Sequence, residues 1–166
     1  MTTNPDVWHS TAVASSGATQ NGPAGAAIAG RANILEMTQA TEDAVLRPAD
    51  PGTWPHDLRT ALASRIARLN GSDALANKYR EMSGTSAHSA LADPSANSSN
   101  KAISAALVFV DQVATQPKDI SADDIKVLQA AGVADADIVR LTEVVAFMAY
   151  QVRLTAGLAL LAEMKS

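Results

Sequence analysis

Few side chains in this sequence could do chemistry, and none of them is a cysteine. The absence of cysteine excludes disulfides, thiolate metal ligands and cysteine nucleophiles. The histidines, His9, His56 and His88, show no metal-ligand spacing, and each is expected in or beside a loop. We therefore predict no metal site and no cofactor.

The hydroxyl of Ser72 could act as a nucleophile only if a base lay beside it. The nearest lysine in the sequence, Lys78, falls on a different helical face. Ser72 directly follows Asn70-Gly71, a typical helix stop, so we expect its side chain to cap the helix that begins there. Tyr79 is spaced from Leu75 as a core residue of that helix, although its hydroxyl could donate a hydrogen bond to a ligand.

Arg153 is an informative charged residue because it lies in an otherwise apolar stretch. A charge within a buried helix must be paired, or must face a cavity or an interface. Its expected partner is Glu143, Asp111 or an acid of a partner subunit. The alternative is that Arg153 binds the carboxylate of a substrate.

Helical spacing of apolar residues predicts the elements that position these side chains. We expect helices over residues 30–46, 55–70, 72–82, 101–116, 121–132 and 135–164. No segment alternates with a period of two, so the predicted fold class is all-α, a multi-helix bundle. Residues 1–29 are predicted to form a weakly structured N-terminal arm, and residues 30–166 a single helical domain.

Two of these helices carry predictions about which face is buried. In the first, Ile34, Met37, Thr41 and Val45 recur at helical spacing and form the expected apolar face. In the second, the apolar stripe is formed by leucines and an isoleucine, and its arginines fall largely elsewhere on the helix. The last helix is apolar almost all round, which predicts either the centre of the bundle or a subunit contact.

Composition limits the class of protein and of partner. Apolar residues make up 47% of the 166 residues and aromatic residues only 4%, which suits closely packed helices. The formal charge is −4, and the 13 lysines and arginines are spread along the chain, which argues against a nucleic-acid partner. We see neither a secretory signal nor an unbroken apolar span. We expect a soluble protein with no membrane association, cytoplasmic by default.

A family resemblance rests on two runs of sequence. Residues 58–71, LRTALASRIARLNG, followed by a helix, resemble the core of the alkyl hydroperoxidase D and carboxymuconolactone decarboxylase family. The segment ISADDI at 120–125, then Gly132 and a long last helix that contains Arg153, resemble the second half of the same domain. The likeness spans residues 30–164. It implies an alkyl hydroperoxidase D-like bundle that works as a homo-oligomer, commonly a dimer, trimer or hexamer.

In redox-active members of that family, the Asn-Gly corner precedes a Cys-x-x-Cys pair, with a histidine beyond it and a glutamate upstream. A thiol at a helix N-terminus has a lowered pKa, and the histidine and glutamate relay its proton. At the matching positions this chain has Ser72, Leu75, Tyr79 and Thr60. None of these replaces the thiol pair or the relay, so the resemblance implies a member without thiol peroxidase activity.

The leading hypothesis from the sequence is an oligomeric helical scaffold or small-molecule-binding protein. The alternative is a decarboxylase-type enzyme, in which His56, Tyr79 and Arg153 form a pocket for a small acidic molecule. That alternative requires at least two of the three side chains to converge on a concave site. A binding or regulatory module would use the same cavity without chemistry.

Overall fold

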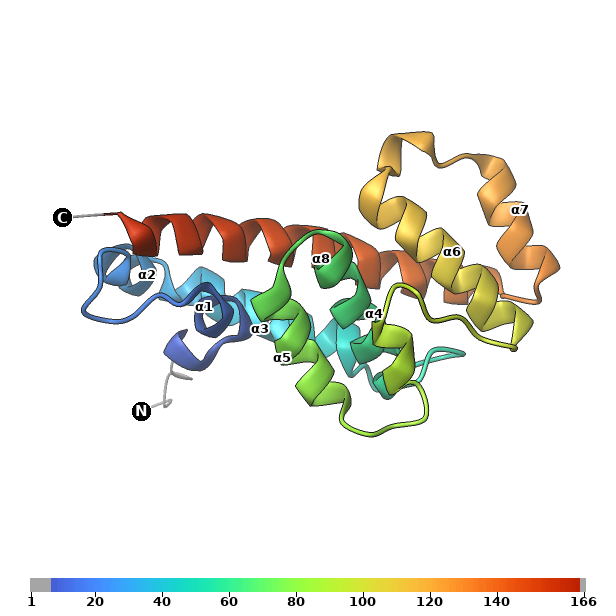
Figure 1. The fold of residues 1–166 in the computed structure, drawn as a ribbon, viewed down its shortest axis with the longest axis horizontal. Helices are drawn as coiled ribbons and strands as arrows, with labels where there is room; N and C mark the ends of the chain where they lie inside the picture. The colour runs from blue at the N-terminus through green and yellow to red at the C-terminus, as the bar shows by residue number, and fades with distance from the viewer. Residues whose placement is uncertain (1–6, 165–166) are drawn as a thin grey trace.

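The computed structural model describes residues 7–164, which are all-α and contain no strand (Figure 1). The α-helices are α1 (Thr11–Ser16), α2 (Gly25–Gly30), α3 (Ala32–Leu46), α4 (His56–Leu69), α5 (Asp73–Ser83), α6 (Lys101–Thr115), α7 (Ala122–Ala130) and α8 (Asp135–Glu163). Short 3-10 turns are η1 (Val7–His9), η2 (Ser89–Ala92) and η3 (Pro117–Asp119). The predicted all-α class is confirmed, and α3 to α8 lie close to the predicted limits.

The corner between α4 and α5 forms as the Asn-Gly sequence predicts. Gly71 has a positive φ of 70°, a conformation that glycine adopts without steric cost. Its amide donates to Arg68 O at 3.0 Å and that of Ser72 donates to Ala67 O at 2.9 Å, which is the Schellman pattern. The predicted capping by Ser72 is wrong, because its side chain makes no cap hydrogen bond. With ψ of 75°, Ser72 is not in the extended conformation that N-cap residues usually adopt.

Helix α4 is the centre of the larger core. All of its residues from 58 to 67 are buried, and it packs against α5, η2, α6 and α8. Trp54, which precedes α4, is fully buried, and its Nε1 donates to Asp137 O at 2.7 Å. The ordering of this end of the bundle therefore depends on α8 as well as on α4.

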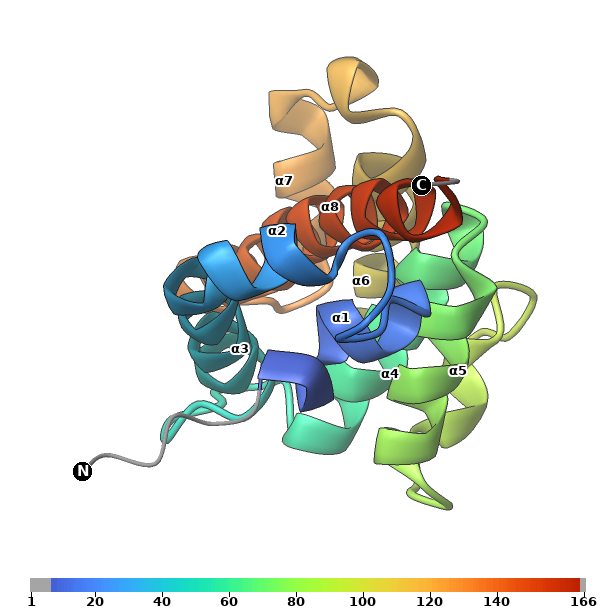
Figure 2. The same ribbon diagram turned by 90° about the vertical axis from the view of Figure 1, so that its left-hand side faces the viewer.

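The described part of the N-terminal arm differs from the weak structure expected for residues 1–29. Residues 7–29 contain η1, α1 and most of α2, and residues 1–6 lie outside the described range. Val13 and Ile28 are buried, and they form a second, smaller core with Leu35 and Leu158. The arm thus packs on α3 and α8 of its own chain, at the C-terminal end of α8 (Figure 2).

Helix α8 runs the length of the molecule, with α6 and α7 beside its N-terminal part (Figure 1). One side of α8 is buried and the opposite side is open to solvent, where Tyr150 is 45% exposed and Leu160 is 68% exposed. By length and composition alone α8 could also cross a membrane, but core helices of soluble proteins pass the same test. A helix that is buried on one side only would normally have polar residues on its other side, but α8 exposes apolar residues there.

Candidate functional site

Glu42 is fully buried in α3 and accepts four hydrogen bonds from side chains. Its Oε1 accepts from Thr11 Oγ1 at 2.7 Å and from Gln39 Nε2 at 3.2 Å. Its Oε2 accepts from Tyr79 Oη at 2.8 Å and from Gln151 Nε2 at 3.0 Å. A buried carboxylate with this many donors stays satisfied without a ligand, so the cluster joins α1, α3, α5 and α8.

The buried face of α3, which contains Glu42, differs from the face predicted from the sequence. Met37 is 65% exposed, and Thr41 is also exposed, whereas the buried residues of α3 are Leu35, Thr38, Glu42 and Leu46. The true face is rotated by one residue because it includes a carboxylate that the rest of the chain satisfies. Apolar spacing alone cannot identify such a face.

Tyr79 occupies the position that matches the relay histidine of the family, but it is fully buried beside Glu42. Burial, together with the negative charge of Glu42, raises the pKa of Tyr79 well above its ordinary range. The phenol therefore stays protonated at neutral pH and donates its proton to the carboxylate in a hydrogen bond. It cannot relay protons for a reaction at the α4–α5 corner.

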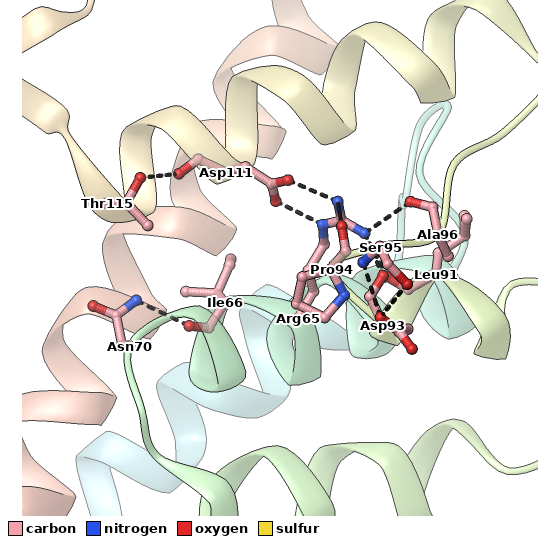
Figure 3. A network of polar contacts seen from close by, with 10 residues as sticks. All are labelled: Arg65, Ile66, Asn70, Leu91, Asp93, Pro94, Ser95, Ala96, Asp111 and Thr115. Carbon is pink, nitrogen blue, oxygen red and sulfur yellow. Dashed lines mark hydrogen bonds and ion pairs between the residues drawn. The ribbon is translucent and has the colours of Figure 1, made fainter.

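Arg65 is the centre of a second saturated cluster (Figure 3). Its Nε and Nη2 donate to the two carboxylate oxygens of Asp111 at 2.6 and 2.7 Å. Its remaining N–H groups donate to backbone carbonyls of the loop between η2 and α6, including Asp93 O at 2.6 Å and Pro94 O at 2.8 Å. Arg65 is only 3% exposed, so this guanidinium fixes the loop and α6 to α4 and has no N–H group left for a ligand.

Arg59 has the same role at the other end of α4. It is 1% exposed and donates to Trp54 O, Val45 O and Pro51 O at 2.9, 2.7 and 3.0 Å. Arg59 and Arg65 lie off the predicted apolar stripe, yet they too are buried, because every residue of α4 from 58 to 67 is enclosed. Both arginines can be buried because backbone carbonyls, and for Arg65 also the carboxylate of Asp111, accept the hydrogen bonds that water would otherwise accept.

A groove between α6 and α8, with a volume of about 380 Å³, contains the one predicted ligand residue that faces a cavity, Arg153. We call it the α6/α8 groove. Its lining residues are Asn70, Val113, Ala114, Thr115, Pro117, Thr142, Val145, Ala146, Ala149 and Arg153. Among these described residues Arg153 alone is charged, and the walls are mostly small and apolar.

The neutral polar residues of the α6/α8 groove are held by their own helices. Asn70 Nδ2 donates to Ile66 O at 2.9 Å, and Thr115 Oγ1 donates to Asp111 O at 2.7 Å (Figure 3). Thr142 on the opposite wall likewise donates to a carbonyl of α8. These side chains are therefore oriented before any ligand binds, and their oxygens remain available as acceptors.

Arg153 is exposed, which corrects the expectation that it is buried and paired. Its Nη1 donates to Ala149 O of the same helix at 2.7 Å. Asp111, one of its predicted partners, pairs with Arg65 instead. In the described part of the chain no carboxylate forms an ion pair with Arg153. The geometry leaves its guanidinium facing the groove.

The other residues singled out in the sequence lie elsewhere. His56 is exposed at the start of α4, with Nε2 2.9 Å from Pro48 O. Thr60 is buried and donates to His56 O at 2.8 Å, and Leu75 is fully buried in the core. Neither His56 nor Tyr79 lines the α6/α8 groove. Among described residues, no three side chains of the metal-binding types come together.

Comparison with known proteins found no matching family model, no matching curated protein and no matching solved structure. The family resemblance of the sequence therefore remains a prediction. Function has to be argued from the groove and from the charges that the fold leaves free.

Proposed function

We propose that this protein binds a small acidic molecule in the α6/α8 groove and carries out no thiol or decarboxylase chemistry on it. The observation that supports the proposal is the position of Arg153, a cation without an acidic partner among the described residues, in a groove with mostly apolar walls. A guanidinium binds a carboxylate through two parallel hydrogen bonds. An acidic ligand with an apolar body would match both features.

The size of the groove suits a small molecule. Ligand sites usually enclose about 300–1,000 Å³, and the groove, at about 380 Å³, lies at the lower end of that range. Thr115 and Thr142 keep hydroxyl oxygens that could accept from a donor group on the body of the ligand, and Asn70 keeps one amide N–H that could donate to it. These polar groups are few, as is typical of sites that bind a largely apolar molecule.

Binding without catalysis is favoured by the residues that line the groove. Of the described residues there, none is a histidine, a carboxylate, a lysine or a tyrosine, so no side chain is suited to transfer a proton at neutral pH. In terms of the family resemblance, the protein would be a non-thiol, alkyl hydroperoxidase D-like member that retains the helical frame and the arginine. The decarboxylase alternative lacks support because His56 and Tyr79 do not join Arg153.

A homo-oligomer is a second part of this proposal, and one observation favours it. The solvent side of α8 exposes several large apolar residues along its length, Val139, Tyr150, Leu160, Leu161 and Met164, three of which lie in its last turn or just after it. Apolar residues gathered on one helix face are typical of a subunit contact. Light scattering would report a dimer or larger assembly, and a stable monomer would contradict this part alone.

The ligand proposal is tested by titrating the full chain with benzoate and hexanoate. We expect shifts in the backbone amide resonances of Ala114, Ala146 and Ala149, and no release of carbon dioxide. Arg153→Gln should weaken binding about tenfold or more, because it removes a charge-assisted bidentate pair. Lys78→Gln, which removes the same charge at an exposed position outside the groove, is the charge-matched control. Equal binding by both variants would refute the proposal, and product formation would favour the decarboxylase alternative.

A further inference from the structure

A second pocket lies where the ends of α4 and α5 meet η2 and the loop after it. It has a volume of about 410 Å³ and shares no lining residue with the α6/α8 groove. Its lining residues are Arg68, Arg80, Ser89, Ala90, Ala92, Asp93 and Ala96. In the view of Figure 3, Asn70 and Thr115 of the groove lie to one side of Arg65, and Asp93 and Ala96 lie to the other.

Arg68 has a buried donor that the chain does not satisfy. Its Nε–H is inaccessible to solvent and has no hydrogen-bond partner. One helical turn earlier, Arg65 donates hydrogen bonds to the nearby loop carbonyls Asp93 O, Pro94 O and Ala96 O. Arg68 is half-buried and forms no ion pair with a described carboxylate, so the rest of its guanidinium stays available to a ligand.

Arg80 adds a second guanidinium to the same pocket. It is exposed in the last turn of α5 and forms no ion pair with a described carboxylate. Asp93 is the one acid among the lining residues, and its Oδ1 already accepts from the amide and hydroxyl of Ser95, both at 2.8 Å. Hydrogen bonds from Ser95, with the nearby charge of Arg68, lower the pKa of Asp93. With Asp93 ionised, two cations and one anion leave a net positive pocket.

We propose that Arg68 and Arg80 form a binding site for the phosphate group of a small phosphomonoester. A phosphate dianion has three terminal oxygens, so it can accept hydrogen bonds from the forks of two guanidinium groups at the same time. A carboxylate has two oxygens and half the charge, and it matches a single arginine. The volume of the pocket leaves room for the group to which the phosphate is attached.

The test is a titration of the full chain with inorganic phosphate, glucose 6-phosphate and AMP at constant ionic strength, followed by NMR. We expect saturable shifts in the backbone amides of Ala90, Ala92 and Ala96. Acetate at the same ionic strength should not produce these shifts.

Matched variants separate a built site from general surface charge. Arg68→Gln and Arg80→Gln should each weaken binding of the esters about tenfold or more, while Arg31→Gln, which lowers the net charge equally but lies outside this pocket, should leave it nearly unchanged. Arg80 is exposed, so its substitution keeps the proposal testable if Arg68→Gln does not fold. Equal weakening by all three variants, or binding of inorganic phosphate but of neither ester, would overturn the proposal.

Discussion

The hydrogen bond from Tyr79 to Glu42 should be one of the strongest single polar contributions to the stability of this fold. Tyr79→Phe removes the hydroxyl that donates to Glu42 Oε2 at 2.8 Å and leaves the ring in place. Phenylalanine introduces no new unsatisfied group, so the variant reports on the carboxylate alone. Glu42 keeps its other three donors but loses part of the stabilisation that its buried charge requires.

The magnitude follows from the charge of the acceptor. Hydrogen bonds to charged groups contribute roughly 1.5–3 kcal/mol, so we expect Tyr79→Phe to lower the free energy of unfolding by about 2 kcal/mol. For a chain of this length the midpoint of thermal unfolding should fall by about 4–8 °C. Tyr150→Phe is the control, because its hydroxyl lies 2.9 Å from the neutral Thr38 hydroxyl and its side chain is 45% exposed. That variant should lose about 0.5–1 kcal/mol.

The assay is urea unfolding followed by tryptophan fluorescence, to which Trp8 and the fully buried Trp54 contribute, with the slope against urea expected to be equal in the three proteins. Alkaline pH gives a second measurement. Because the folded protein raises the pKa of Tyr79 above its ordinary value of 10.0, the unfolded chain releases the proton first, and stability should fall as the pH rises above 10.0. The phenylalanine variant should lose less stability there. If Tyr79→Phe cost no more than Tyr150→Phe, the assignment of Glu42 as a buried, ionised acceptor would be wrong.

Three further predictions concern other parts of the fold. Gly52→Ala should lower the free energy of unfolding in urea by about 1–3 kcal/mol, because Gly52 has a φ of +59° and an added Cβ would lie 2.2 Å from Asp137 Oδ1. Gly30→Ala is the control and should be nearly neutral, because an added Cβ there would meet open space. Burial opposes ionisation of Asp137, but hydrogen bonds from Thr53 and Arg140 lower its pKa below 3.8, so the stability lost in Asp137→Asn should be constant above that pH and should shrink as the pH falls below it. Leu160→Glu places a charge on the exposed side of α8 and should shift light scattering towards monomer without changing the helical circular dichroism signal.

The helices themselves could be predicted because their signals are local. Ser121 shows this well: its Oγ accepts from Asp123 N, and Asp124 Oδ2 accepts from the Ser121 amide at 2.7 Å, which completes the capping box that the sequence indicates. The Asn-Gly corner likewise requires only a residue that tolerates a positive φ. Signals of this kind lie within one turn of the chain, so spacing alone reveals them.

The buried polar clusters could not be predicted because their partners are distant in sequence. Arg65 is 46 residues from Asp111, and Glu42 is 37 residues from Tyr79 and 109 residues from Gln151. From sequence alone, a charged residue on a helix is predicted to be exposed to solvent, because its distant partner cannot be identified. The sequence did contain one clue to these clusters. The loops after α3 and between η2 and α6 have backbone carbonyls that no helix or strand can satisfy, and such carbonyls need donors from side chains.

The candidate binding sites were identified by separating charged side chains that have partners within the chain from those that have no acidic partner among the described residues. Each nitrogen of the buried guanidinium groups of Arg59 and Arg65, and each oxygen of the buried Glu42 carboxylate, has a hydrogen-bond partner in the chain, so these groups hold helices and loops together. Arg68 and Arg153 differ because each keeps donors without an acidic partner among the described residues, and each lines a pocket. A substitution in the first group should therefore change stability, whereas substitution of the exposed Arg153 should change ligand binding and leave stability nearly constant. Measuring both quantities for Arg65→Gln and Arg153→Gln distinguishes a structural arginine from a binding one.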